Sequence, residues 1–189
     1  MHGRELTVRS LTAKEIDPKR VMEAIERLEH PRDKALIALV YLSAGRISEV
    51  LKLMPEDVTV KDDFMVVNLW TAKRKKGVKT RKVPVPLTHP LLKYFVLWFQ
   101  QVKRNQPIFH NLYDPSKPIS RVQAWKILKR AKADMWLHLL RHIRLSELVE
   151  KYNFDPFRLQ QFAGWSDVKP ASFYVHLGWQ ASAEKLREK

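Results

Sequence analysis

The chain has 189 residues, of which 45% are hydrophobic and 29% charged, and it contains no cysteine. These values are typical of a single folded globular domain, and they exclude disulfides, thiolate catalysis and cysteine-based zinc sites in this chain. Lysine and arginine number 35 against 20 acidic residues, which gives a net charge of +15. Such a charge favours a polyanionic partner, above all nucleic acid.

Membrane attachment is not expected. No apolar run approaches the ~20 residues of a membrane span, and the first residues lack the apolar segment of a signal peptide. No long amphipathic helix pairs an aromatic face with a cationic one. We therefore expect a cytoplasmic protein with no membrane partner.

The first third of the chain has helical periodicity. Residues 1–11 form a polar lead-in, and apolar spacing then predicts helices over about 18–29 and 32–43. The second of these is apolar nearly all round, which indicates a central position. Gly45 is expected to end it, and a further helix is expected over 46–53.

The period then changes to that of a β-strand. Apolar and other residues alternate over 64–70, which predicts a strand. Residues 73–82 are rich in lysine and predict a basic turn, and 83–85 predict the returning strand. Pro84 requires that strand to lie at an edge. The result is a small antiparallel sheet with a lysine-tipped hairpin.

The rest of the chain is helical again. Caps and breakers such as Ser120, Asp155-Pro156 and Gly164 set the expected limits. Helices are expected over about 88–104, 120–133, 135–151, 156–162, 169–177 and 181–188. The predicted fold class is mainly α with a small three-stranded antiparallel β-sheet (α+β).

Five side chains together indicate phosphoryl chemistry. His138 and Arg141 are three residues apart on one helical face, and Arg46 supplies a second guanidinium at a helix start. Downstream lie an indole, Trp165, and a phenol, Tyr174, nine positions later. A phosphodiester attacked by a phenolate needs such a nucleophile, with cations and proton donors around it.

Each residue alone has a structural interpretation. Arg46 could simply pair with Glu49. His138 and His142 could form a metal pair at i and i+4, although Leu139 stands where the metalloprotease pattern needs glutamate. Aromatic residues near a chain end more often pack than react. The combination therefore carries more weight than any of its members.

The order of these motifs resembles the catalytic domain of tyrosine recombinases, the phage-type integrases, over about residues 12–180. The motifs are Arg46-Ile-Ser-Glu49, a lysine in a basic hairpin, His138-x-x-Arg141-His142, Gly164-Trp165 and Tyr174-x-His176. The chain departs from the family pattern at three positions. Trp165 replaces the more usual histidine, Leu139 stands where an acid is common, and Ile143 where threonine or serine is common.

The resemblance implies a site-specific DNA recombinase or integrase that needs neither metal nor ATP nor another cofactor. Tyr174 would attack the scissile phosphate and form a 3′-phosphotyrosine intermediate. Arg46 and Arg141 would hold the non-bridging oxygens, with Trp165 as a further donor. His138 would help move the tyrosine proton.

The resemblance also assigns supporting roles. Glu49 would orient its neighbours, and His142 is placed among the supporting residues. A hairpin lysine would protonate the departing 5′-oxygen, and the sequence leaves Lys73 and Lys76 as candidates. The stiffness of strand geometry favours Lys73. The remaining cations of the hairpin are expected to bind DNA electrostatically: Arg74, Lys75, Lys79 and Arg81.

Assembly and partners follow from the same resemblance. The substrate would be double-stranded DNA, and residues 181–189 resemble a segment that docks on a neighbouring protomer, which implies a homotetramer on DNA. Family members usually carry a separate helical domain first, so this chain is either a fragment or a minimal enzyme. Two alternatives remain: a type IB topoisomerase-like enzyme that relaxes DNA, and a non-catalytic basic DNA-binding protein of the same fold.

Overall fold

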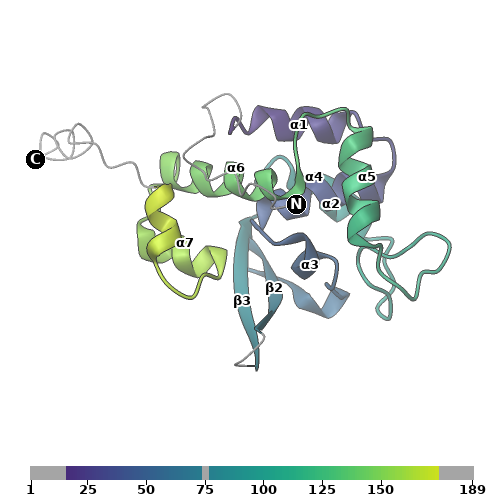
Figure 1. Cartoon of the computed structure of the whole chain (residues 1–189). Helices are drawn as coiled ribbons and strands as arrows, with labels where there is room; N and C mark the ends of the chain where they lie inside the picture. Colours follow the sequence, from purple (N-terminus) through teal and green to yellow (C-terminus); the bar gives the residue numbers. More distant parts are fainter. Residues whose placement is uncertain (1–15, 74–76, 175–189) are drawn as a thin grey trace, which may run out of the picture.

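The computed structural model describes residues 16–73 and 77–174. The lead-in at 1–11, the segment 181–189, His176 and the hairpin-tip residues Arg74, Lys75 and Lys76 lie outside this range. Within it the fold is α+β, as predicted, with helices gathered into one body and a β-hairpin extending away from it (Figure 1).

The described residues form seven α-helices, two short 3-10 helices and three strands. The α-helices are α1 (Lys19–Glu26), α2 (Pro31–Leu42), α3 (Ile47–Val50), α4 (Leu92–Phe99), α5 (Arg121–Arg130), α6 (Leu137–Glu150) and α7 (Pro156–Ala163). The 3-10 helices are η2 (Pro55–Asp57) and η3 (Lys169–Phe173). The strands are β1 (Val58–Lys61), β2 (Phe64–Lys73) and β3 (Gly77–Pro86). No helix in the described part of the chain is long and apolar enough to cross a membrane.

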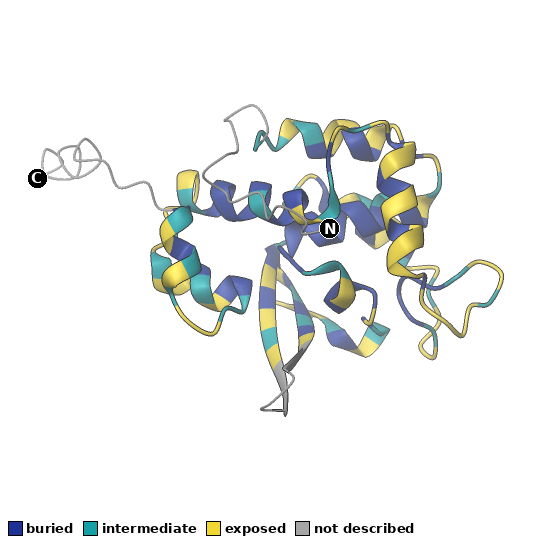
Figure 2. Ribbon diagram, in the orientation of Figure 1, coloured by how far each residue is buried: buried dark blue, intermediate teal, exposed yellow. Residues whose placement is uncertain are grey.

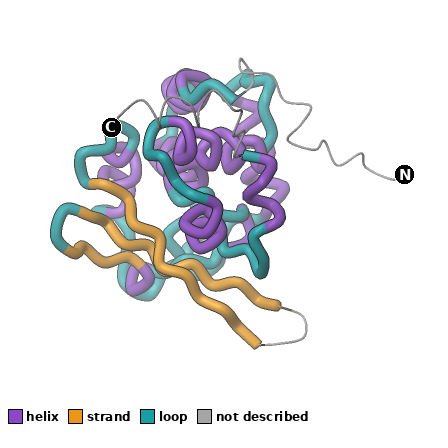
Figure 3. The backbone as a smooth tube through the Cα atoms, turned by 90° about the vertical axis from the view of Figure 1, so that its left-hand side faces the viewer, coloured by secondary structure: helices purple, strands orange, loops and turns teal. Residues whose placement is uncertain are grey.

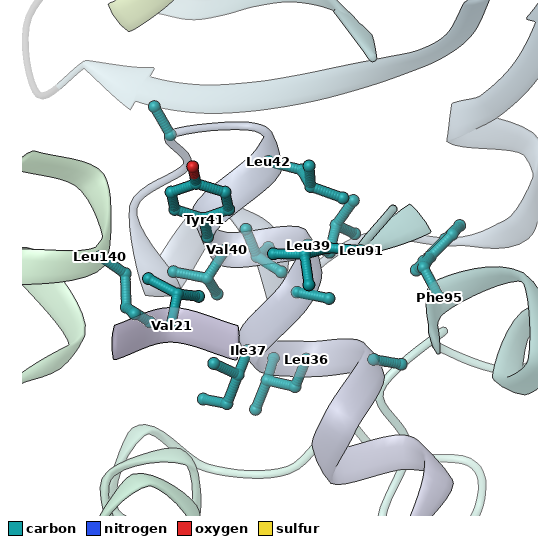
Figure 4. Close-up of a cluster of buried hydrophobic side chains, with 14 of the residues drawn as sticks. Val21, Leu36, Ile37, Leu39, Val40, Tyr41, Leu42, Leu91, Phe95 and Leu140 are labelled. Carbon is teal, nitrogen blue, oxygen red and sulfur yellow. The ribbon is translucent and has the colours of Figure 1, made fainter. Parts of the chain in front are cut away.

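Helix α2 is the centre of the core, as its uniformly apolar sequence predicted. Its residues Ala35–Leu42 are all buried, and it packs against α1, α4 and α6. In Figure 4 its side chains point outward in several directions and meet Val21, Phe95 and Leu140. A helix surrounded on all sides has no solvent face on which polar residues are needed.

Polar residues instead mark the outer helices. Figure 2 shows α5 with an exposed outer face, whereas α2 and much of α6 are buried. Helix α5 begins at the predicted cap, because the Ser120 side chain accepts a hydrogen bond from the Gln123 N–H. Helix α7 is similarly capped by Asp155, which accepts from the Phe157 and Arg158 N–H groups.

The sheet is antiparallel with the order β1-β2-β3. Pro84 lies on β3, opposite Val66 of β2. Strand β3 is at an edge of the three-stranded sheet, as the proline predicted. The predicted turn over 73–82 is wrong in extent, because β2 and β3 stay paired as far as Lys73 and Gly77. Backbone pairing requires no apolar side chains, so a lysine-rich strand does not show in the hydrophobic pattern. Figure 3 shows the resulting long hairpin.

Several helix limits also differ from the prediction. Helix α4 spans only Leu92–Phe99, since Pro90 disfavours helix before it and the polar residues after Phe99 have little to bury. Helix α3 stops at Val50, ahead of the extended Met54 that precedes Pro55. Helix α2 already ends at Leu42, and the left-handed residue of the next turn is Ala44 rather than Gly45. A side chain at Gly45 would collide with Val50 and Ser43, so this glycine provides space.

Candidate active site

Arg141 is anchored from within the fold. It lies on α6 with only 2% of its surface exposed. Its Nη2 donates to the Ala163 carbonyl at 2.8 Å, and its Nη1 donates to the Ala44 carbonyl. These bonds use two of the five guanidinium N–H groups. The turn after α2 and the end of α7 therefore hold this guanidinium in one orientation.

A second group of charges adjoins it. Glu49 is buried and its Oε1 accepts from Arg46 Nη1 at 3.0 Å. Its Oε2 accepts from the Arg46 backbone N–H at 3.0 Å and from Arg81 Nη2 at 2.9 Å. Arg46 is the residue immediately before α3, as the sequence predicted, and its pairing with Glu49 is the structural interaction expected for it. One carboxylate thus serves two guanidiniums.

The cluster is electropositive. Burial lowers the pKa of Arg141 to about 9, with further lowering by Arg46 and Arg81 and opposing effects of Glu49 and Tyr174. Arg141 therefore stays charged at neutral pH, although its positive neighbours disfavour its charge. Three guanidiniums against one carboxylate leave a net positive site that suits an anion with several oxygens, such as a phosphate diester.

Tyr174 lies between two other rings. It follows η3 directly, and its ring stacks at 5.9 Å from the His142 ring and at 5.7 Å from the Trp165 ring. The Arg141 guanidinium lies 5.6 Å from the centre of the Trp165 ring. The Tyr174 hydroxyl contacts His142 Nδ1. The phenol predicted as nucleophile and the guanidinium predicted to bind phosphate therefore both lie against the Trp165 ring.

The two histidines of the motif differ in environment. Burial lowers the pKa of His142 to about 4, with smaller contributions from His138 and Arg141. His142 is thus neutral near pH 7, and Nδ1 can accept a hydrogen bond from the phenol. Burial also raises the pKa of Tyr174, so the phenol keeps its proton. His138 is exposed and meets the His142 ring edge-on, with centroids 4.6 Å apart.

Two surface hollows meet at Arg46. One, of about 360 Å³, is lined by Arg46, Glu49, Lys52, Trp70 and the turn Gly164–Asp167. The other, of about 760 Å³, is lined by Arg46, Trp125 and His138 among others. Predicted site residues from distant parts of the chain, Arg46, Glu49, His138 and Trp165, therefore line these two hollows.

The structure brings most of the predicted site together: Arg46, Glu49, Arg81, His138, Arg141, His142, Trp165 and Tyr174. Lys73 ends β2 opposite Gly77, and Lys79 pairs with Thr71 on the neighbouring strand. The side chains of these two lysines are not among the described parts, and Arg74, Lys75 and Lys76 lie outside the described residues. The assignment of the general acid to Lys73 or Lys76 stays a prediction.

Sequence reasoning missed several contributors. The carbonyls of Ala44, Phe162 and Ala163 hold the arginines, and no side-chain pattern marks a backbone acceptor. Lys52 lines the smaller hollow and is exposed. The sequence could have indicated Lys52 only through its position, one helical turn beyond Ser48 and Glu49.

Comparison with known proteins places the chain in a family. The phage integrase family matches residues 9–180. A tyrosine recombinase XerD of Staphylococcus epidermidis is 29% identical over 182 residues, covering 85% of this chain and 58% of that protein. XerD of Staphylococcus aureus is 27% identical with the same coverage. The chain spans less than two thirds of the length of these relatives.

Solved structures show the same fold at lower identity. XerH recombinase, in a post-cleavage complex with its difH substrate, has a TM-score of 0.67 at 21% identity, covering 95% of this chain and 53% of that one. The catalytic domain of bacteriophage HP1 integrase has a TM-score of 0.57 at 18% identity, covering 88% and 86%. With the family matched over most of its length, this chain belongs to the phage integrase family and has the fold of a tyrosine recombinase catalytic domain.

Proposed function

We propose that this chain breaks and rejoins DNA strands with Tyr174 as the nucleophile. The observation that carries the proposal is the position of the Tyr174 phenol, stacked on the same Trp165 ring that the buried Arg141 guanidinium contacts. In the reaction the Tyr174 oxygen attacks phosphorus, and the bond from phosphorus to the 5′-oxygen breaks. The products are a 3′-phosphotyrosine link and a 5′-hydroxyl, and attack by another strand's 5′-hydroxyl reverses the step.

The phosphate would be held by fixed cations. Arg141 keeps its orientation through two carbonyls, and Arg46 keeps its own through Glu49. Donors that are already placed before the reaction stabilise the charge of a pentacovalent transition state without reorganisation. The Trp165 indole N–H would add a neutral donor to this set.

The tyrosine proton would leave through the histidines. His142 Nδ1 contacts the Tyr174 hydroxyl, and the His138 ring lies against His142. We infer that His142 accepts the proton first and that His138, at the exposed end of the pair, exchanges it further. The proton on the departing 5′-oxygen would come from Lys73 or Lys76.

Double-stranded DNA is the proposed substrate. The net charge of +15 favours it, and the related XerH and Tn1549 integrase structures contain DNA. This chain spans only part of the length of its relatives, so the proposal for the chain itself is strand cleavage. Recombination of whole sites is proposed for a tetramer assembled on DNA.

Covalent trapping tests the proposal. The probe is a duplex library with randomised sequence around a 5′-bridging phosphorothiolate, whose thiol leaving group does not return. Wild-type protein should form a denaturation-resistant adduct, Tyr174→Phe should form none, and Tyr113→Phe at a fully exposed tyrosine should match wild type. No adduct with any duplex would leave a non-catalytic DNA-binding protein, and relaxation of supercoiled DNA without strand exchange would indicate a topoisomerase.

A further inference from the structure

We propose that Arg81 is a positioning residue that joins the β-hairpin to the Trp165 turn and to the Glu49–Arg46 pair. This role rests on the proposed function and replaces the direct DNA contact expected for Arg81 from the sequence. It makes the hairpin, which carries the candidate lysines, part of the same rigid frame as the phosphate-binding groups.

The Arg81 side chain is turned into the protein. Only 8% of it is exposed. Its Nη2 donates to Glu49 Oε2 at 2.9 Å, and its Nε donates to the Phe162 carbonyl at 3.1 Å. Two nitrogens of this guanidinium therefore bond groups of the protein itself.

The bond from Arg81 to Phe162 helps to satisfy the unpaired backbone carbonyls at the carboxyl end of α7. The last four carbonyls of a helix lack partners within the helix. The Trp165 and Gly164 N–H groups bond the carbonyls of Gln160 and Gln161. The remaining two carbonyls are taken by guanidiniums, Phe162 by Arg81 and Ala163 by Arg141. Positive charge at this end of a helix is also favoured by the helix dipole.

The turn at Gly164 is shaped around Arg81. Gly164 has φ +67, a left-handed conformation that favours glycine. A Cβ at this position would lie 2.8 Å from Arg81 Cδ and 2.9 Å from Arg81 Nη1. Arg81 therefore occupies the space left by the missing side chain, directly beside the residue that precedes Trp165.

Three segments distant in sequence thus meet at one guanidinium: β3, the start of α3 through Glu49, and the end of α7. Glu49 also orients Arg46, so a substitution of Arg81 should alter the positions of both Arg46 and Trp165. Lysine cannot replace it, because one ammonium on a flexible stem cannot serve the Glu49 carboxylate and the Phe162 carbonyl in the same fixed geometry.

The experiment compares Arg81→Lys with Lys82→Gln, a change at the exposed neighbour on β3. On the duplex that wild type cleaves, Arg81→Lys should keep DNA affinity and its salt dependence. Adduct formation on saturating DNA should fall by ~10- to 100-fold, the order expected for misplaced catalytic groups. Lys82→Gln should cleave bound DNA at the wild-type rate and lower the salt slope by at most about one unit.

A readout independent of cleavage separates this inference from the proposed function. The indole N–H resonance of Trp165 in the DNA-free protein, assigned with Trp165→Phe, should shift in Arg81→Lys and stay in place in Lys82→Gln. An unshifted resonance, or Arg81→Lys cleaving bound DNA as fast as wild type, overturns the positioning role. If wild type forms no adduct but the resonance shifts, the proposed function fails and the positioning of Trp165 by Arg81 stands.

Discussion

The hydroxyl of Tyr174 contacts Nδ1 of His142, 32 positions earlier in the chain. The low pKa of His142, about 4, leaves the imidazole neutral at neutral pH, so Nδ1 can accept a hydrogen bond from the phenol. The histidine that the family resemblance singled out for the tyrosine proton, His138, lies against the His142 ring, with centroids 4.6 Å apart. The contact with the Tyr174 hydroxyl gives His142 a more direct role than the sequence assigned to it.

Replacing His142 with phenylalanine keeps a ring in the stack and removes the acceptor atom. We expect DNA affinity to be retained and adduct formation to fall by ~10²-fold or more, the usual contribution of a placed proton acceptor. Single-turnover trapping on the phosphorothiolate duplex measures this rate. Equal rates for His142→Phe and wild type would exclude His142 from the proton path.

Two half-buried histidines should make stability depend on pH. Burial lowers the pKa of both His142 and His89 to about 4, whereas the unfolded chain binds these protons near ~6.5. Between these values the unfolded state holds more protons than the folded state, so stability is lost as pH falls from 6.5 towards 4. The melting temperature of His89→Gln/His142→Gln should fall less steeply over this range than that of wild type. Parallel curves would show that neither histidine is held neutral.

Arg141→Lys tests the fixed guanidinium. A lysine at this buried position cannot bond both Ala44 and Ala163 carbonyls and still face a phosphate. Cleavage should fall by ~10²-fold or more, as for loss of an oxyanion donor. DNA affinity should change little, because this is one of many charges. A variant that cleaves at the wild-type rate, measured at a temperature where circular dichroism shows it folded, contradicts this role.

Gly164→Ala should disturb the fold and the site together. A left-handed alanine costs about 1–2 kcal/mol, which lowers the melting temperature by roughly 2–8 °C. Gly164→Asn is the matched control, because asparagine tolerates the left-handed conformation but still carries a Cβ against Arg81. The asparagine variant should be the more stable of the two, and both should cleave slowly. Wild-type cleavage by either would show that contact with Arg81 does not matter.

The hairpin lysine can be identified by changing the leaving group. Loss of a general acid matters less when the departing atom is sulfur, which leaves without protonation. Lys73→Ala and Lys76→Ala should therefore differ on a normal duplex, and the phosphorothiolate should restore cleavage only for the variant that lacks the acid. Rescue of both, or of neither, would mean that neither lysine acts alone.

The sequence by itself determined the family and the fold class, and it predicted which groups react. The motif order around Arg46, Arg141 and Tyr174 is a property of side chains, and side chains are what a sequence records. The caps at Ser120 and Asp155, the central α2 and the stop at Gly164 were also predictable. Each depends on local geometry or on apolar periodicity.

Only the tertiary structure decided how these groups hold one another. Arg141 bonds the carbonyl of Ala44, 97 positions away, and Arg81 bonds that of Phe162, 81 positions away. The backbone carbonyl is the same group in every residue, whatever its side chain. Nothing in the sequence therefore marks which carbonyl will face a guanidinium. In the sequence, Arg81 is likewise indistinguishable from the other cations of the basic hairpin. Only the tertiary structure shows that its side chain packs against Gly164 inside the protein. The choice between His138 and His142 likewise depends on where the chain returns at Tyr174, which no spacing along a single helix can show.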